Sequence, residues 1–411
     1  MSDRLPGAFE TMALLPEARE NPYPLLEKLR SECPVHRDDV AGLFMLTRHA
    51  DARAILSDNS LHKDPDKTEQ AAYLARFRRG AVPDGLIYLA DSRSTILDMD
   101  DPGHERIRTP LVKALYARAA RFRPEVERIV DEAIAKLEGK ESFDIVSEFS
   151  VPVPVDVIAS LLGVDLDRMA DFRNWSEGVV QTFNHARTPE QTAWLVRSAN
   201  ELGTYMLETM AARKANPQDD LVTDMMKLQA EGAPLTDGEI SVNLQMLLVG
   251  GNLTTADLIS NGIRLFLAHP DQRAKLLENP TLAAPAVEEV LRFDGPVDLT
   301  VRVTPREMEV GGCPVHATQV MGVSLRGANR DPEVFENPDK FDITRKPAPH
   351  LAFGGGSHIC VGAPLARMEA QVAFVKLLQR FPNLRLKNPD APLKWRALPM
   401  FRGLESLELR T

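Results

Sequence analysis

A single cysteine ends a run of glycines that also contains a phenylalanine and a histidine. Cys360 closes the run FGGGSHIC, which begins at Phe353, and a helix-like segment follows at 363–380. A thiol near a helix N-terminus is favoured as the thiolate by the helix dipole. Thiolate sulfur is a preferred ligand of soft metal ions. The loop is therefore a candidate metal site built around one sulfur atom.

The glycines on both sides of the cysteine would let the backbone pass close under a flat ligand. Gly354, Gly356 and Gly362 can adopt positive φ and have no Cβ to clash. A lone cysteine is more often a small buried hydrophobe, and a glycine-rich turn before a helix can also bind phosphate. The joint pattern is far rarer than either part, and it lacks the Lys-Ser/Thr ending of a P-loop.

The spacing Phe-Gly-x-Gly-x-His-x-Cys-x-Gly resembles the haem-ligating loop of the cytochrome P-450 family, the haem-thiolate monooxygenases. The resemblance covers nearly the whole chain, most specifically residues 98–110 and 236–370. It implies haem b (iron protoporphyrin IX) as the cofactor, with Cys360 as the axial metal ligand and Gly354 beside the ring. It also implies that Phe353 shields the sulfur from water and that His358 reaches a haem propionate.

Three further residues match positions that hold the propionates in that family. His104 and Arg108 lie one helical turn apart, and Arg302 lies on a predicted strand after Pro296. Two propionate carboxylates need charge-assisted partners, which these side chains would supply.

A long apolar helix is predicted to carry the oxygen side of the site. It includes Gly250 and Thr254, and the resemblance implies that small residues open the helix beside the iron and that the threonine helps to deliver protons to dioxygen. The family usually has Asp or Glu before this threonine, whereas this chain has Leu253, which cannot carry a proton. Asp257, one turn further on, is the candidate substitute through water. We therefore expect slower or less coupled turnover, or reliance on Asp257.

The resemblance also suggests which segments line the substrate pocket, and most of their residues are apolar, as a hydrophobic substrate requires. Asp298 is the exception: we expect it to face solvent, and if it faced the pocket it would favour an amine or a hydroxyl. The predicted lining is Leu86, Ile87, Met246, Val249, Gly250, Val297, Asp298, Met400 and Phe401.

A structural ion pair is predicted between Glu289 and Arg292, which are three residues apart on one helix face. The family usually adds a third, basic partner from a later Pro-x-x-Phe stretch, and here that stretch offers Lys340. Lysine cannot form a planar bidentate fork, so we expect a looser network.

Composition excludes several classes of protein. The 411 residues carry a formal net charge of -10, which argues against a nucleic-acid-binding protein. Three scattered cysteines suit a reducing compartment, and Cys33 and Cys313 are predicted to be free thiols without a role. The N-terminus lacks the apolar core of a signal peptide, and no stretch reaches the ~18 apolar residues of a membrane span. We expect a cytoplasmic monomer without a membrane anchor.

Periodicity predicts a mainly α (α+β) protein, and the resemblance implies the cytochrome P-450 fold in one domain over 1–411. The helical core is expected at about 103–293 and 361–380, and the β-rich parts at about 34–47, 299–323 and 384–411. A capping box at Thr236 and Glu239 predicts the start of the long helix, which continues to about Ala268. Residues 60–101 show no long periodic face, and a loop of this length in a compact protein is usually functional.

The leading functional prediction is a monooxygenase that inserts one atom of O2 into a C–H bond of a hydrophobic small molecule. No reductase domain is recognisable, so electrons would come from a separate ferredoxin-type partner, docking near Arg106, Lys113 and Arg367. Three alternatives remain open: a peroxide-driven peroxygenase, a non-catalytic haem- or ligand-binding protein, and a helical enzyme with a phosphate-binding glycine loop.

Overall fold

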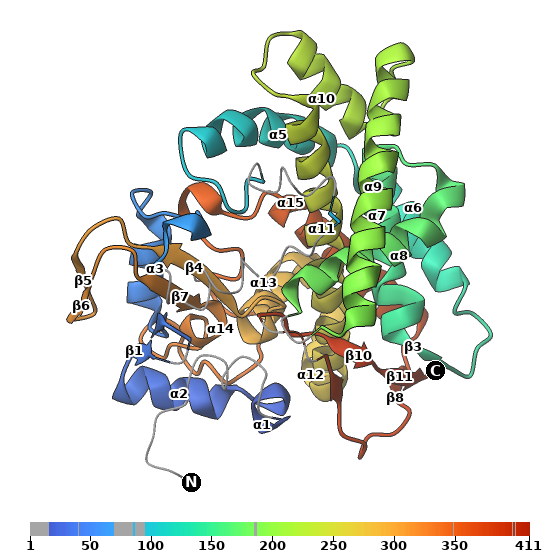
Figure 1. The fold of residues 1–411 in the computed structure, drawn as a ribbon. Coiled ribbons are helices and arrows are strands. Elements are labelled where there is room, and N and C mark those ends of the chain that lie inside the picture. Colours follow the sequence, from blue (N-terminus) through green and yellow to red (C-terminus); the bar gives the residue numbers. More distant parts are fainter. Residues whose placement is uncertain are drawn as a thin grey trace.

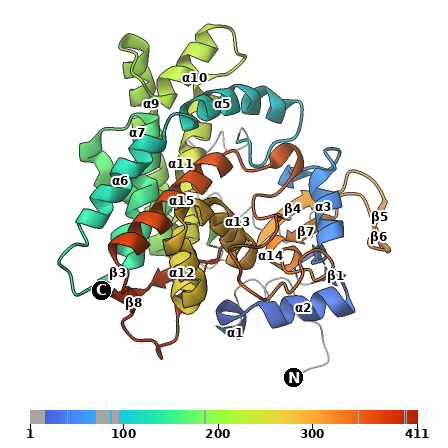
Figure 2. The same ribbon diagram turned by 180° about the vertical axis from the view of Figure 1, so that it is seen from behind.

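Helices form most of the molecule, and short strands gather in two small regions on opposite sides of it (Figures 1 and 2). The computed structural model describes residues 16–39, 41–69, 85–86, 95–184, 187–347, 349–396, 398 and 400–411. The helices are α1 (Pro16–Glu20), α2 (Tyr23–Glu32), α3 (His49–Ser57), α5 (Gly103–Ala119), α6 (Arg123–Ala135), α7 (Pro152–Leu162), α8 (Met169–Val180), α9 (Pro189–Ala215), α10 (Leu221–Ala230), α11 (Asp237–Ala268), α12 (Pro270–Glu278), α13 (Ala283–Asp294), α14 (Leu325–Ala328) and α15 (Ala363–Arg380).

The strands are short and lie mainly at the two ends of the chain. They are β1 (Val35–Asp38), β2 (Leu43–Leu46), β3 (Ser142–Asp144), β4 (Leu299–Val303), β5 (Met308–Val310), β6 (Cys313–Val315), β7 (Val320–Ser324), β8 (Arg385–Leu386), β9 (Lys394–Trp395), β10 (Leu404–Ser406) and β11 (Glu408–Arg410). The predicted fold class, mainly α with a small β-rich part, is confirmed.

The long helix α11 is the central element. It begins at the predicted capping box, where the Thr236 hydroxyl accepts from the Glu239 N–H at 3.1 Å, and it ends at Ala268. It packs against α7, α8, α9 and α15. Gly262 permits the contact with α15, because a Cβ there would lie 2.2 Å from the Phe374 ring. α11 is therefore buried over most of its length, as its apolar sequence predicts.

The largest sheet joins the first strands of the chain to later ones in the order β1-β2-β7-β4. β2 and β7 are parallel, and the other two pairs are antiparallel. β5 and β6 form a separate hairpin through Gly311 and Gly312, whose φ values of +55° and +82° suit glycine. This arrangement places β4, the strand that carries Arg302, in the same sheet as the N-terminal strands, with β7 between β4 and β2.

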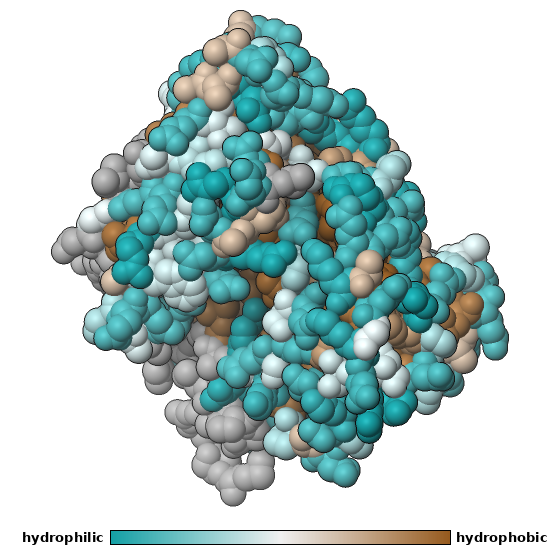
Figure 3. Space-filling model, turned by 90° about the vertical axis from the view of Figure 1, so that its right-hand side faces the viewer, coloured by the Kyte–Doolittle hydropathy of each residue, from teal (hydrophilic) through white to brown (hydrophobic). Residues whose placement is uncertain are grey.

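The molecular face on the side of α6, α8 and α9 is predominantly hydrophilic, with hydrophobic residues in small separate areas (Figure 3). Within the part of the chain that the structure describes, no helix has both the length and the apolar character needed to cross a membrane.

Candidate functional site

The cysteine loop is closed by its own backbone. The Cys360 N–H donates to the Phe353 carbonyl at 3.0 Å, and Gly354 and Gly356 have φ values of +72° and +66°. Gly356 also lies so close to α3 that a Cβ would come within 2.2 Å of the Leu56 carbonyl oxygen. Both glycines are therefore required by the path of the chain, as the sequence predicts.

The Cys360 sulfur is exposed and accepts hydrogen bonds from the N–H groups of Gly362 and Ala363, at the start of α15. Burial by the surrounding chain nevertheless raises the thiol pKa, and the two N–H groups and the Arg108 and Arg367 cations only partly oppose this. The start of α15 thus favours the thiolate, as expected from the sequence, but it does not outweigh the effect of burial. A bound metal cation would supply the missing stabilisation, because metal binding releases the thiol proton.

His104 and His358 lie together beside the loop. Their rings stack with centroids 4.1 Å apart, and His104 Nδ1 lies 3.1 Å from Asp101 Oδ1. His104 Nε2 is buried and has no hydrogen-bond partner among the residues that the structure describes. A buried ring nitrogen without a partner is costly, so a polar group is expected to fill this position when the site is complete.

Two arginines reach the same loop from different elements. Arg108 on α5 donates to the Ile359 carbonyl, and Arg302 on β4 donates to the Gly355 carbonyl at 3.4 Å. Arg302 is 3% exposed, and burial lowers its pKa to about 10, with Asp100 opposing. The structure thus brings together His104, Arg108, Arg302 and His358, all predicted from the sequence.

Lys63 is a fifth basic group that the sequence analysis missed. Its ammonium donates to Thr300 Oγ1 at 3.1 Å, and burial and Arg302 lower its pKa to about 8. It lies in the aperiodic segment 60–101, where only the length of the loop indicated a functional role. We call these five residues the cationic cluster: Lys63, His104, Arg108, Arg302 and His358.

The cationic cluster has too little negative charge of its own. Burial and the other four members together lower the pKa of His358 to about 3. Asp100 is close, but its Oδ2 already contacts Lys67 at 2.8 Å and His62 at 3.0 Å. A ligand with carboxylates would neutralise the cluster and accept from His104 Nε2. Together with an accessible cysteine sulfur, this donor set fits the propionates and iron of a haem.

On α11, the Thr254 hydroxyl donates to the Gly250 carbonyl at 2.7 Å. Its neighbours Asn252 and Leu253 have other partners. Asn252 donates to Ser176 at 2.8 Å, and Leu253 packs with the buried residues Val180, Val249 and Leu398.

Asp257, the candidate substitute acid, is 2% exposed, and both of its carboxylate oxygens accept from Arg396. Burial raises its pKa to about 6, with Arg396 opposing. The carboxyl group is thus held in an ion pair between α11 and the segment after β9.

The predicted substrate residues fall into different packing environments. Val249 and Phe401 lie in one small apolar cluster with Val180, Leu398 and Leu253. Val297 and Met400 pack into two other clusters, and Met246 packs against the main core. Leu86 is half-buried, and Ile87 lies outside the described residues.

The expectation that Asp298 faces solvent is wrong. Asp298 is 1% exposed, its Oδ2 lies 3.7 Å from Arg326 Nη1, and Ser324 Oγ lies 3.4 Å from its Oδ1. The Asp298 N–H donates to the Met400 carbonyl, and this hydrogen bond connects the residue before β4 to the C-terminal segment. The buried arginine Arg326 explains the difference, because it provides the charge partner that water would otherwise supply.

The ion pair of Glu289 and Arg292 is confirmed, but its predicted third partner is wrong. Arg292 binds both Glu289 oxygens at 2.7 and 2.8 Å. Arg345 Nε, rather than Lys340, approaches Glu289 at 3.2 Å. The Lys340 side chain is exposed beside Asp342, and only its carbonyl takes part, accepting from Arg292 and Arg345. An arginine can reach this buried carboxylate and still satisfy several carbonyls with its planar fork.

Two of the three cations in the predicted docking patch are already paired. Arg106 binds Glu239 through both oxygens. Arg367 binds Glu288 at 2.7 and 2.8 Å and stacks on the Phe353 ring, 4.5 Å from its centroid. Lys113 on α5 is exposed. The patch is therefore less positive than its sequence suggests.

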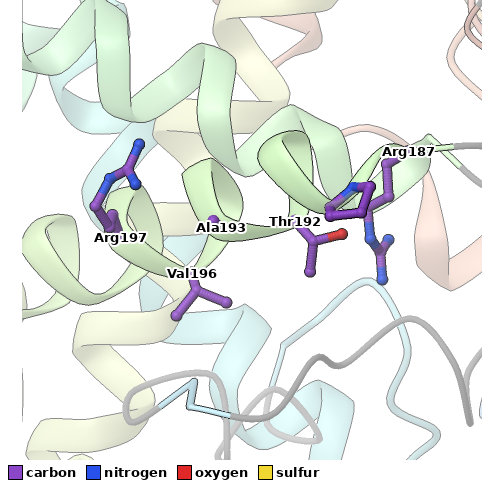
Figure 4. A pocket seen from close by; sticks show the side chains of 6 residues that line it. Arg187, Thr192, Ala193, Val196 and Arg197 are labelled. Atoms are coloured by element: carbon purple, nitrogen blue, oxygen red, sulfur yellow. The ribbon is translucent and has the colours of Figure 1, made fainter.

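A separate surface pocket lies along α9 and includes none of the predicted substrate residues. Figure 4 shows Arg187 and Arg197 at its two ends, with Ala193 and Val196 between them. Pro189 and Thr192 complete the lining.

Comparison with known proteins agrees with this geometry. Residues 87–397 match the family model described as "Cytochrome P450". Cytochrome P450 107B1 of Saccharopolyspora erythraea is 38% identical over 401 residues, which is 95% of both chains. The biotin biosynthesis cytochrome P450 of Bacillus subtilis is 33% identical over 95% of this chain and 96% of its own length.

Solved structures show the same fold. The crystal structure of P450BioI in complex with hexadec-9Z-enoic acid ligated acyl carrier protein has a TM-score of 0.85 and 32% identity, covering 96% of this chain and 99% of the other. CYP109E1 from Bacillus megaterium in complex with testosterone has a TM-score of 0.83 and 29% identity, with coverage of 95% and 99%. The chain therefore belongs to the cytochrome P450 family of haem-thiolate monooxygenases.

Proposed function

We propose that Cys360 supplies the thiolate that binds the haem iron and that the cationic cluster binds the two propionates. The observation that carries this assignment is the buried Nε2 of His104, which no described residue partners, within a group of five basic side chains beside the cysteine loop. Phe353, whose ring contacts the Arg367 guanidinium, is proposed to shield the sulfur from water. When bound, the haem-thiolate centre supplies the reduction of dioxygen and the oxidation of the substrate.

The finer activity that we propose is insertion of one oxygen atom of O2 into a C–H bond of a hydrophobic small molecule. The apolar cluster of Val180, Val249, Leu253, Leu398 and Phe401 next to Thr254 supports a hydrophobic substrate. The fatty acyl and steroid ligands named for P450BioI and CYP109E1 are hydrophobic as well. Electrons are proposed to come from a ferredoxin-type partner, and three free cysteines fit a reducing compartment such as the cytoplasm.

The chain's own contribution to protonation is the Thr254 hydroxyl. In this structure the hydroxyl donates to the Gly250 carbonyl. If the hydroxyl turned away from that carbonyl, its proton would be free for donation on the side of the haem where dioxygen binds. Asp257 could pass protons to this region only after releasing Arg396. Leu253 contributes packing and no proton.

The assignment of Cys360 is tested by the spectrum of the reduced, carbon monoxide-bound protein. We expect the strongly red-shifted Soret band of thiolate-ligated haem in the wild type and in the control variant Cys313→Ser. It should be absent in Cys360→Ala and in Cys360→His, the second of which keeps an iron ligand. A red-shifted band in either Cys360 variant would refute the assignment.

The oxygen source and the electron route are tested together. Purified enzyme is supplied with a ferredoxin, its reductase and ¹⁸O2, and we expect one labelled oxygen atom in the product of a fatty acid or steroid substrate. A peroxygenase is the second candidate, because Leu253 replaces the usual acid and Asp257 is held by Arg396. Turnover with hydrogen peroxide but not with the ferredoxin system would favour it, and haem binding without either turnover would indicate a non-catalytic protein.

A further inference from the structure

Two cysteines outside the haem-binding residues lie together at an edge of the four-stranded sheet. Cys33 follows α2, and Cys313 begins β6. The Cys33 S–H donates to the Val35 carbonyl at 3.6 Å, and the Cys313 S–H points to the same oxygen at 3.8 Å. Both sulfurs thus lie around one oxygen atom, although the sequence separates the two residues by most of the chain.

Packing holds the β5–β6 hairpin against this edge. Val310, Val315 and Cys313 join Val35 in one apolar cluster. Gly311, with a φ of +55°, comes so close that a Cβ would lie 2.7 Å from Val35 Cγ2. Burial raises the pKa of Cys33, and the Cys313 thiol adds to this rise. Both side chains are half-buried, so small reagents can reach them.

We propose that Cys33 and Cys313 form an oxidant-dependent disulfide that joins the end of α2 to the β5–β6 hairpin, with hydrogen peroxide as the oxidant. One thiolate attacks the O–O bond of the peroxide, so that an S–O bond forms and hydroxide leaves. The second sulfur then attacks the resulting sulfenic acid, forming the S–S bond and releasing water. Two thiols are oxidised, and one peroxide is reduced to two water molecules.

The proposal is tested on the haem-loaded enzyme. The protein is treated with a small excess of hydrogen peroxide, its remaining thiols are blocked with N-ethylmaleimide, and it is digested without reduction. We expect one mass-spectrometric species that contains the peptides of Cys33 and Cys313 and that disappears on reduction with dithiothreitol. Closing so long a loop should also raise the thermal midpoint by roughly 5 °C, reversibly.

Cys33→Ser and Cys313→Ser should each abolish the cross-linked species and the shift in thermal midpoint. Dibromobimane, which becomes fluorescent when it bridges two neighbouring thiols, gives an independent measurement on the reduced enzyme. We expect bridging in the wild type and none in either variant. Separate oxidation of the two thiols without a cross-link, cross-links only between molecules, or no bimane bridging in the wild type would each overturn the proposal.

Discussion

At the scale of single residues, the proposed delivery of protons to dioxygen rests on one hydroxyl group. Thr254 bonds to the Gly250 carbonyl, while Leu253 belongs to an apolar cluster and Asn252 is committed to Ser176. A side chain that moves protons typically contributes a rate factor of at least about 10² when it works with an acid. In this chain Leu253 replaces the neighbouring acid, so we expect the rate of product formation to depend less on Thr254.

Thr254→Ala should therefore lower product formation by roughly tenfold and divert electrons to hydrogen peroxide. Thr254→Ser keeps a hydroxyl at the same position and should retain most of the product yield. Product and peroxide formed per NADPH consumed are the quantities to measure. Equal coupling in wild type and Thr254→Ala would show that protons reach the oxygen side by another route.

The residues that sequence reasoning placed well share a local pattern. Cys360, His104, Arg108 and Thr254 lie in short motifs whose spacing is fixed by one loop or one helical turn. Lys63 and Arg345 lie in no such motif, because they reach their partners only through the folded chain. The same holds for the two thiols at Val35, which were predicted to have no role.

At the scale of elements, the most accurate prediction was for a helix whose N-terminus carries a capping box. The capping box at Thr236 and Glu239 gave the start of α11, and its apolar length gave its central position. The short helix α3 was missed, since it has no side-chain cap. β3 was missed as well: it has only three residues and pairs with β11 at the far end of the chain, so no local pattern marks it.

The ion pair between Asp257 and Arg396 ties α11 to the C-terminal segment and makes stability depend on pH. The pKa of Asp257 is about 6 in the folded protein, above its ordinary value of 3.8, so the folded state binds this proton more tightly. Its contribution to stability therefore falls as pH rises from about 4 to 6. Without Arg396, the pKa of Asp257 in the folded protein rises further. The loss of stability with rising pH then extends above pH 6.

Arg396→Ala should thus be destabilising by roughly 3 kcal/mol at pH 8 and by much less at pH 5, where the carboxyl is already mostly protonated. Urea unfolding midpoints at both pH values measure the difference. Arg410→Ala, at an exposed position on β11, is the control and should have little effect. The same destabilisation at pH 5 and pH 8 would contradict the assigned ionisation of Asp257.

The buried carboxylate of Glu289 connects α13 to the segment that precedes the cysteine loop. Arg345 contacts Glu289 and also donates to the carbonyls of Glu336, Asn337 and Lys340 at 2.6, 3.1 and 2.9 Å. Arg345→Ala should lower stability by roughly 3 kcal/mol and reduce haem content. Lys340→Ala removes only an exposed side chain and should change stability by about 0.5 kcal/mol or less. Similar losses in thermal midpoint for the two variants would contradict this ranking.

At the scale of the whole molecule, the family resemblance of the sequence gave the fold, since element order and hydrophobic pattern are spread over the entire chain. It could not give the balance of charge at the surface, which depends on pairs formed between distant segments. Arg106 and Arg367 are neutralised by Glu239 and Glu288. Single-domain organisation and a monomeric state remain predictions.

The ion pairs of Arg106 and Arg367 leave Lys113 as the exposed cation of the predicted docking patch. An acidic partner would be attracted by Lys113, which is exposed on α5, more than by the two paired arginines. Lys113→Glu should slow reduction by a ferredoxin several-fold at low ionic strength, and the effect should shrink at about 0.5 M salt because screening weakens attraction between exposed charges. Lys394→Glu, on β9, makes the same charge change as a control, because β9 pairs with β10, which lies away from α5 (Figure 1). Equal slowing by both variants would indicate an effect of net charge, whereas slowing by Lys113→Glu alone would place the docking surface on α5.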